Sequence, residues 1–196
     1  MAGVLKAKNS RQRTKRGKGG KRENCLNIFS TNAAGLKNKM QSFKNEIEHT
    51  NAAIFTIQET HAKKKGTIKV EQFEIFEAIR EKQKGGTLIG IHKSLNPMLI
   101  KEYSSEFELL IVEIEIARRK IRIISGYGPQ ETWSEQDRLP FFLALEDEIN
   151  KAEMENKEVF IQADFNSKLG PEIIRDAKWK TFVKYIGEAC SKCDKF

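Results

Sequence analysis

Short apolar runs that end on polar residues recur along this chain and predict β-strands. Three of them are "CLNIFSTN" (25–32), "AAIFTIQET" (52–60) and "EVFIQ" (158–162). Two more, "QFEIFEAI" (72–79) and "GGTLIGIHKS" (85–94), are separated by a charged stretch that leads into two glycines, which is typical of a turn. The pattern therefore predicts at least five strands with polar connections.

A longer segment, "FELLIVEIEIARRKIRIISGYG" (107–128), predicts a β-hairpin. In its first half, apolar residues alternate with glutamates, so the strand has an apolar face and a polar face. The apolar face consists of Leu110, Val112, Ile114 and Ile116, and the other face carries Glu113 and Glu115.

Apolar residues at helical spacing predict helices between these strands. One helix is expected over 36–50, and a second over 134–155 with Ser134 as its N-cap, although Pro140 interrupts that pattern. The stretch 177–189 predicts a third. The stripes are Leu36, Met40, Phe43 and Ile47 in the first helix, and Phe142, Leu145 and Ile149 in the second, where Asp137 completes the cap. Helices mixed with strands and a hairpin indicate α+β or mixed α/β layers.

Length and composition limit the organisation of the chain. With 196 residues and 39% hydrophobic residues, it can form one sizeable core, which favours a single domain. No window approaches the roughly 18 consecutive apolar residues of a membrane helix, and the first residues lack the apolar region of a secretion signal. We therefore expect a soluble intracellular protein without a membrane partner.

The net charge of +8 is concentrated at the N-terminus. Residues 1–24 contain nine Lys and Arg and one acid, which leaves 26 basic and 26 acidic residues in the body. A Gly/Lys/Arg run of this kind is expected to be a disordered tail, followed by a domain over 25–196. Its functional interpretations are contact with nucleic-acid phosphates or an acidic partner, or nuclear import, and the plain alternative is a solvated tail. The candidate phosphate-binding residues are Arg11, Arg13, Lys15 and Arg16.

Three cysteines add little to this picture. Cys25 precedes an apolar run, and "CSKC" contains Cys190 and Cys193. One C-x-x-C pair without a second pair or suitably spaced histidines is at most half of a zinc site, so reduced, unpaired thiols are expected.

Four predicted strands end in residues that can bind a metal or a phosphate: Asn32, Glu59, Tyr127, and the pair Asp164 and Asn166. Taken singly, each has an ordinary interpretation as a surface carboxylate, a core ring or a turn residue. If the strand ends meet at one edge of a sheet, they form the oxygen-rich kind of site that Mg²⁺ prefers.

The ordered series "NIFSTNAAGL", "IFTIQETH", "KGGTLIGIH", "IISGYGPQ" and "VFIQADFNSKLG" resembles the endonuclease/exonuclease/phosphatase superfamily. It is most similar to the apurinic-type endonuclease domains of non-LTR retrotransposon polyproteins, which also carry a reverse transcriptase, and the resemblance covers about residues 25–170. It implies a DNase I-like fold of four layers, in which helices flank a two-sheet β-sandwich. The implied reaction is hydrolysis of a DNA phosphodiester by a nuclease that uses Mg²⁺ or Mn²⁺.

The resemblance also implies roles for individual residues. Glu59 matches the metal ligand, and Asn32 matches an amide that supports the metal and its phosphate. Tyr127 matches a tyrosine that reaches the scissile phosphate. Asp164 matches the aspartate that orients or deprotonates the attacking water, with Asn166 beside it as a phosphate ligand.

The resemblance also implies a substrate-binding role for Gln130, at a position where the family often has a polar residue. The family also has a Ser-Asp-His motif near the end of the domain, which this chain lacks, because its three histidines, His49, His61 and His92, all precede Asp164. We expect His61 to be an exposed loop residue.

The domain is also expected to lack its last strands, as a C-terminally truncated copy, so hydrolysis should be weak or absent. Two alternatives follow, a catalytically dead remnant that still binds DNA in the nucleus, and a phosphatase of the same superfamily. The sequence does not give the oligomeric state.

Overall fold

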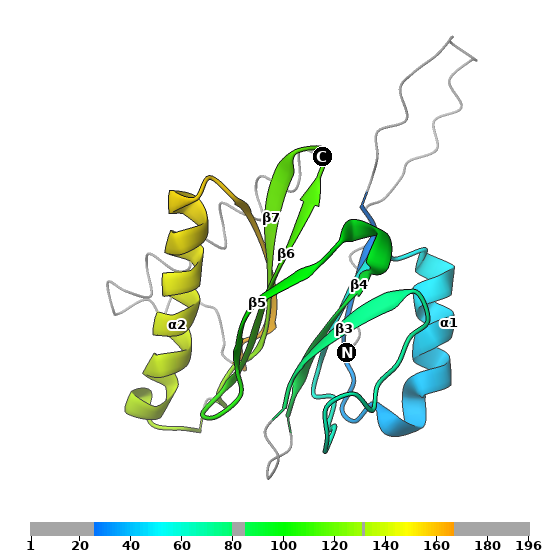
Figure 1. Ribbon diagram of the computed structural model, residues 1–196. Helices are drawn as coiled ribbons and strands as arrows, with labels where there is room; N and C mark the ends of the chain where they lie inside the picture. Colours follow the sequence, from blue (N-terminus) through cyan, green and yellow to red (C-terminus); the bar gives the residue numbers. More distant parts are fainter. Residues whose placement is uncertain (1–25, 80–84, 131, 167–196) are drawn as a thin grey trace, which may run out of the picture.

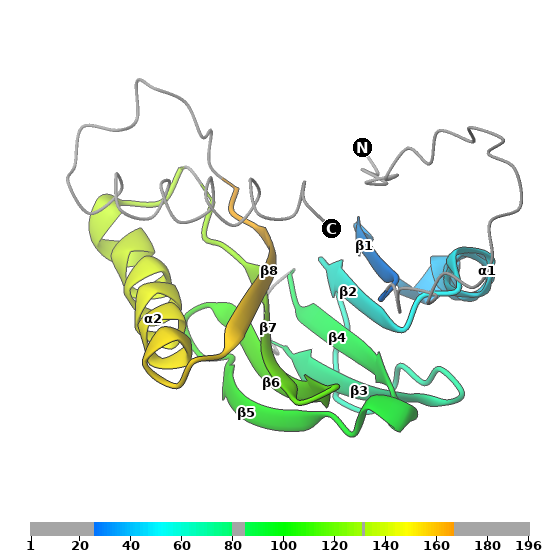
Figure 2. The same cartoon turned by 90° about the horizontal axis from the view of Figure 1, so that it is seen from above.

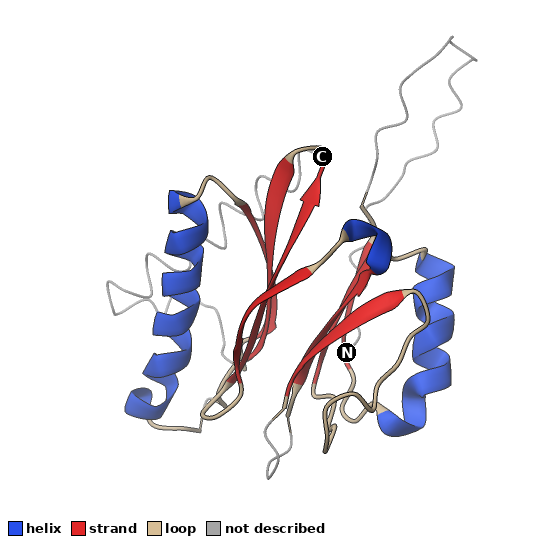
Figure 3. Ribbon diagram, in the orientation of Figure 1, coloured by secondary structure: helices blue, strands red, loops and turns tan. Residues whose placement is uncertain are grey.

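The computed structural model describes residues 26–79, 85–130 and 132–166, which form two four-stranded sheets packed face to face (Figure 1). Sheet A has the order β1-β2-β4-β3 and sheet B the order β5-β6-β7-β8. One helix covers the outer face of each sheet (Figure 3). The strands of sheet A are β1 (Ile28–Asn32), β2 (Ile54–Gln58), β3 (Phe73–Ala78) and β4 (Thr87–His92). Those of sheet B are β5 (Met98–Tyr103), β6 (Glu108–Ile116), β7 (Arg119–Tyr127) and β8 (Glu158–Asp164).

The helices are α1 (Met40–Thr50), which follows the short 3-10 turn η1 (Lys37–Lys39), and α2 (Glu135–Met154). A second 3-10 turn, η2 (Lys93–Leu95), follows β4. The α+β, DNase I-like arrangement of four layers is therefore confirmed. Neither α-helix in the described part of the chain has the length and apolar composition of a membrane span.

Each sheet contains one parallel pair of strands joined by its covering helix. In sheet A, β1 pairs with β2 through α1, and in sheet B, β7 pairs with β8 through α2. Figure 2 shows the two parallel pairs along the same side of the sandwich. Parallel strands joined by a helix end at the same edge of their sheet. The carboxyl ends of β1, β2, β7 and β8 are thereby brought to one edge of the molecule.

Three apolar clusters hold the four layers together, one at each interface between layers. Between the sheets, the cluster includes Ile54, Ile89, Ile91, Leu110, Val112 and Ile123. Between α1 and sheet A it includes Phe43, Ile47, Phe55 and Ile57. Between α2 and sheet B it includes Leu109, Ile111, Ile124, Phe141, Leu145 and Ile149. Both sheets are covered on both faces, so the strand ends rest on a fixed scaffold.

Gly90, in the middle of β4, leaves the space that a large ring on the neighbouring strand occupies. It pairs with Phe55 of β2, and a Cβ atom at Gly90 would lie 2.0 Å from the Phe55 ring. We expect Gly90→Ala to destabilise the protein by about 1–3 kcal/mol, because the buried ring has to move from its packed position. Urea unfolding followed by circular dichroism measures this, and an unchanged midpoint would contradict the packing.

The second helix begins as the sequence predicts. The Ser134 hydroxyl accepts a hydrogen bond from the Asp137 backbone N–H at 3.2 Å and donates to the Asp137 carboxylate at 2.6 Å. The helix continues through Pro140, where Phe141 and Phe142 are buried against sheet B. This packing outweighs the local cost of a proline inside the helix.

One strand was not predicted from the sequence. Strand β5 lies at the edge of sheet B, and Met98, Leu99 and Ile100 on it are exposed. A register shift between Leu99 and Lys101 breaks the alternation that would have indicated a strand. The predicted tail over 1–24, Cys25, Cys190, Cys193 and the predicted helix over 177–189 lie outside the described residues.

Candidate active site

A layer of buried polar side chains joins the two sheets directly below the edge where the parallel strands end. The Gln58 amide donates to Ser125 Oγ and to the Gln162 carbonyl, both at 3.4 Å. The Ser125 hydroxyl also bonds to Thr87 Oγ1 at 2.7 Å. Polar pairs of this kind in a buried layer fix the position of one sheet relative to the other.

A second contact in this layer involves Glu108, which is fully buried and pairs in register with Tyr127. Its carboxylate accepts a hydrogen bond from the Gly86 N–H at 3.1 Å. Since Gly86 precedes a strand of sheet A and Glu108 belongs to sheet B, this bond also connects the sheets. Sequence reasoning missed these residues, although Gln58 and Ser125 are polar residues within otherwise apolar runs.

Above this layer, four predicted site residues meet in one hydrogen-bonded cluster. The Asn32 amide nitrogen donates to Glu59 Oε1 and to Asp164 Oδ2, both at 3.0 Å. The Tyr127 hydroxyl donates to the same oxygen of Glu59 at 3.1 Å. Asn32 Oδ1 accepts from the Ala34 N–H at 3.0 Å, which determines which side of the amide carries the donors. We refer to Asn32, Glu59, Tyr127 and Asp164 as the edge cluster.

The backbone around Glu59 is held in an unusual conformation. Glu59 and His61 both have left-handed φ angles, of 52° and 51°, at a cost of roughly 1 kcal/mol each for residues with a side chain. Hydrogen bonds on both sides hold this segment, because Glu59 O accepts from the Gly35 N–H and the Thr60 N–H donates to Gly86 O. The strained turn directs the Glu59 carboxylate toward Asn32 and Tyr127.

On the other sheet, Asp164 and Asn166 are held by a compact turn. The Asn166 N–H donates to Asp164 Oδ1 at 3.0 Å, and the Asn166 side chain donates to the Gly128 carbonyl at 2.8 Å. Gly128 has to be glycine, since a Cβ atom there would lie 2.9 Å from the Phe165 carbonyl oxygen. This turn keeps the Asp164 carboxylate next to the end of β7.

Tyr127 remains a hydrogen-bond donor at neutral pH. Burial raises the pKa of its hydroxyl, and the negative charges of Glu59 and Asp164 act in the same direction. A hydrogen bond with Asn166 opposes this shift but does not reverse it. The protonated phenol is the form that can donate to Glu59, or to an anion bound in its place.

The loop after the edge cluster is anchored by a buried carboxylate on β3. Glu77, which is 8% exposed, accepts a hydrogen bond from the Gly66 N–H at 2.6 Å through Oε2. Its other oxygen, Oε1, is buried without a hydrogen-bond partner among the residues that the structure describes. Burial raises the pKa of Glu77, whereas the Gly66 hydrogen bond and the charge of Lys65 lower it by less.

The raised pKa of Glu77 predicts a dependence of stability on pH. The folded chain holds this proton more tightly than the unfolded chain, so its contribution to stability falls as pH rises through the raised pKa. Glu77→Gln is uncharged and keeps an acceptor for Gly66, so the variant should gain in melting temperature relative to wild type as the pH is raised from acid to neutral. Glu74→Gln, at an exposed position on the same strand, is the matched control. A constant difference between Glu77→Gln and wild type across this range would exclude the effect.

The other residues considered in the sequence analysis are not members of the edge cluster. Gln130 is exposed beyond the turn at Gly128, and in the described ranges no hydrogen bond joins its side chain to the edge cluster. Arg11, Arg13, Lys15 and Arg16 lie outside the described residues. His61 lies in a loop, as expected, but it is half-buried: its side chain is 31% exposed, and its Nε2 lies 3.8 Å from Glu59 Oε2.

The edge cluster offers oxygen ligands for a divalent cation, but few of them. Across the described ranges, no group of three or more His, Cys, Asp or Glu side chains is placed to hold a metal. The two carboxylates that converge on one amide match the way Mg²⁺ binds in many enzymes, through one or two carboxylates, water and substrate phosphate. A cation would also offset the repulsion between the two acids.

Comparison with solved structures identifies the fold. The protein is similar to an AP endonuclease from Archaeoglobus fulgidus, with a TM-score of 0.58 at 17% identity over 78% of this chain and 62% of that chain. It is also similar to TDP2 from D. rerio complexed with a single-strand DNA product, with a TM-score of 0.55 at 18% identity over 80% of this chain and 64% of that one. For TDP2 from Caenorhabditis elegans the TM-score is 0.54 at 17% identity, over 73% of this chain.

The chain spans about half the length of the Caenorhabditis elegans TDP2 chain, 48%. No family model matches the sequence, and no curated protein matches it. The solved neighbours are members of the endonuclease/exonuclease/phosphatase superfamily, and at these identities the similarity is one of fold.

Proposed function

We propose that the protein is a divalent-metal-dependent phosphodiesterase that nicks DNA, with the edge cluster as its active site. The observation that carries this proposal is the hydrogen bonding of Glu59 and Asp164 to the same amide group of Asn32, across two sheets. Solved proteins with this fold include an AP endonuclease and a TDP2 with bound DNA product, which supports a nucleic-acid substrate.

Glu59 would hold Mg²⁺ or Mn²⁺, and Asn32 would support the cation and its phosphate. When bound, the cation supplies Lewis-acid polarisation of a phosphoryl oxygen and offsets the charge that develops there. The donor set fits such an ion, since carboxylate and amide oxygens are the hard ligands that it prefers.

Residues of the chain would accept the proton of the attacking water and orient the reacting phosphate. The Asp164 carboxylate would take the proton of the attacking water, and the Asn166 N–H orients it through Oδ1. The Tyr127 hydroxyl and the Asn32 amide are donors that can bind the non-bridging oxygens of the reacting phosphate. Asn166 and Gln130 would contact the phosphate from the same side.

The proposal also covers the evolutionary origin of the chain and its rate of phosphodiester hydrolysis. The order of motifs supports descent from the endonuclease domain of a non-LTR retrotransposon. We expect turnover to be slow, because the 196-residue sequence holds no counterpart of the family's histidine. The basic residues over 1–24, including Arg11, Arg13, Lys15 and Arg16, are proposed to bind DNA phosphates and to favour a nuclear location.

The experiment that tests the function compares two substrates. The purified chain is incubated with supercoiled plasmid and, separately, with a water-soluble phosphoinositide, each with Mg²⁺ and with chelator. Nicked plasmid that forms only with Mg²⁺ supports the proposal. Faster release of inorganic phosphate from the phosphoinositide would indicate a phosphatase. A salt-sensitive plasmid shift without hydrolysis of either substrate would indicate a binding protein.

A further inference from the structure

Two segments of the loops that leave the active-site edge are rich in lysine and contain no acid, although the second loop, 59–72, carries Glu59 and Glu71 on either side of its segment. Residues 33–40, after β1, contain Lys37 and Lys39, and residues 62–70, after β2, contain Lys63, Lys64, Lys65 and Lys69. The body of the chain holds equal numbers of basic and acidic residues, so this segregation is a local polarisation of charge beside the site.

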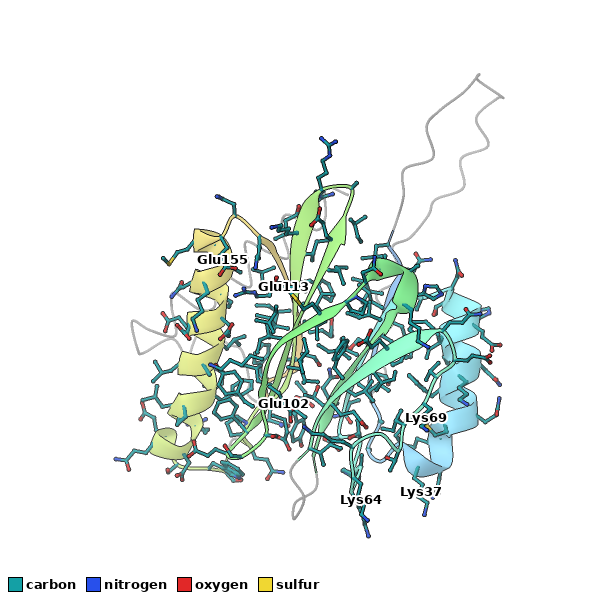
Figure 4. All side chains as sticks on the ribbon, in the orientation of Figure 1. Lys37, Lys64, Lys69, Glu102, Glu113 and Glu155 are labelled. Atoms are coloured by element: carbon teal, nitrogen blue, oxygen red, sulfur yellow. The ribbon has the colours of Figure 1, made fainter. Side chains whose placement is uncertain are left out.

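Four of these lysines are available to a ligand. Lys39 donates to the Ala33 carbonyl, and Lys65 pairs with both carboxylate oxygens of Glu102 on β5 at 2.5 and 2.6 Å. The other four are exposed, and none forms an ion pair with any residue in the described ranges. They are Lys37, Lys63, Lys64 and Lys69. Figure 4 shows Lys37, Lys64 and Lys69 at the end of the molecule where α1 begins.

The second loop is held in place by several contacts. Gly66 is bonded to the buried Glu77, and Thr67 Oγ1 donates to the Lys64 carbonyl at 3.0 Å, which closes the turn at the tip. Ile68 is 8% exposed and packs into the α1-side core. Because the loop is ordered before a ligand binds, little of the binding energy is lost in fixing its backbone.

We propose that Lys37, Lys63, Lys64 and Lys69, here called the lysine rim, bind the phosphate backbone of a polynucleotide that leads into the active site. This inference rests on the proposed function, because it names the substrate class of that site. Several ammonium groups that form no ion pair within the described part of the chain, spread over two loops, suit a chain of repeating phosphates. A small phosphate ester presents one or a few phosphates at the reacting position.

A membrane surface would be the other anionic partner, and the distribution of apolar residues disfavours it. Membrane-binding surfaces combine basic residues with exposed apolar ones. The large exposed apolar residues of the described chain are not on the two loops but on β5 and α2: Met98, Leu99, Ile100, Leu139, Leu143 and Met154. The lysine rim is therefore assigned to a nucleic acid.

The test compares two charge-matched triple variants of the full chain. The rim variant is Lys63→Gln with Lys64→Gln and Lys69→Gln. The control variant removes three exposed cations from the η2 turn, the β6–β7 turn and the start of β7, away from the edge cluster, as Lys93→Gln with Arg118→Gln and Lys120→Gln. Both keep residues 1–24, so the contribution of the basic N-terminus is common to both.

Binding of a fluorescein-labelled single-stranded DNA of about 20 nucleotides is measured by anisotropy in chelator, over about 50–200 mM salt. For the rim variant, the slope of log affinity against log salt should decrease by about 2, since each neutralised single-strand phosphate contributes about 0.7. Affinity near 0.1 M salt should fall about 100-fold, since the counterion contribution vanishes near 1 M, and the control variant should stay within about twofold of wild type. If the triple rim variant does not fold, Lys64→Gln alone should lower the slope by about 0.7.

Equal slopes for the rim and control variants would overturn the inference. It would also be overturned if the rim variant lost binding only to vesicles that contain a phosphoinositide and kept its affinity for DNA. The binding assay needs no hydrolysis, so it is independent of the proposed chemistry. That chemistry is tested by metal-dependent cleavage of bis(p-nitrophenyl) phosphate by the wild-type protein, a small diester that does not reach the rim.

Discussion

Replacing Asp164 by asparagine is expected to lower the rate of DNA nicking by about 10²–10⁴-fold, the usual contribution of a general base. Asparagine keeps an oxygen that can accept from the Asn166 N–H, but it cannot take a proton from water. It also turns an amide donor toward the Asn32 donor, so the bond between the two sheets at this point is lost. The rate is measured on supercoiled plasmid under single-turnover conditions.

The matched control for Asp164→Asn is Glu158→Gln, at the other end of the same strand. Glu158 is half exposed and pairs with Arg119 at 2.6 Å, and its loss should leave nicking unchanged. Equal rates for Asp164→Asn and wild type would show that Asp164 is not the proton acceptor. Circular dichroism of both variants confirms that any loss of rate is not caused by unfolding.

The largest effect on stability is expected from Arg122→Ala. Arg122, 3% exposed on β7, donates to Glu113 Oε1 at 2.9 and 2.7 Å, to the Glu148 carbonyl at 3.1 Å and to Glu155 Oε2 at 2.9 Å. Removing the guanidinium leaves Glu113 and Glu148 buried without their shared partner. Glu113 keeps Lys157 at 2.7 Å and Glu148 keeps Lys151 at 3.2 Å, so the cost should lie near the lower end of the range for a broken buried pair, about 3 kcal/mol. Because Arg122 ties α2 to sheet B, the loss also loosens the crossover that leads to β8 and Asp164.

Urea unfolding measures the effect, with Arg119→Ala as the control on the same strand. The pair between Arg119 and Glu158 is largely exposed and screened by solvent, so its removal should shift the unfolding midpoint only slightly. If Arg122→Ala cost no more than Arg119→Ala, the buried ion network would not hold α2 against sheet B.

The sequence predicted the strands that carry a clear apolar run or a regular alternation, and it predicted the polar ends that meet in the edge cluster. It did not predict β5, because an exposed edge strand with a bulge has neither a continuous apolar run nor a regular alternation. Nor could spacing alone bring Asn32 to Asp164, which are 132 residues apart and belong to different sheets. That contact depends on the two parallel pairs that end at the same edge.

Two further features of the site depend on tertiary contacts. His61 turns toward Glu59 because its N–H donates to the Gly85 carbonyl in a left-handed turn, which no local pattern indicated. In the sequence, Gln58, Thr87 and Ser125 cannot be told apart from ordinary strand residues. Only the packing of the two sheets brings their side chains together in the polar layer. The parts of the site set by strand ends were therefore predictable, and the parts set by contacts between sheets were not.

Whether the edge cluster is a metal-dependent phosphodiesterase site is decided by nicking of supercoiled plasmid by wild type and Glu59→Gln over a Mg²⁺ titration. We expect slow nicking that requires Mg²⁺ and falls at least about 10³-fold in Glu59→Gln, since the charged ligand is lost while the amide keeps the size of the side chain. Nicking that is equal in the two proteins, or that persists in chelator, would contradict this expectation.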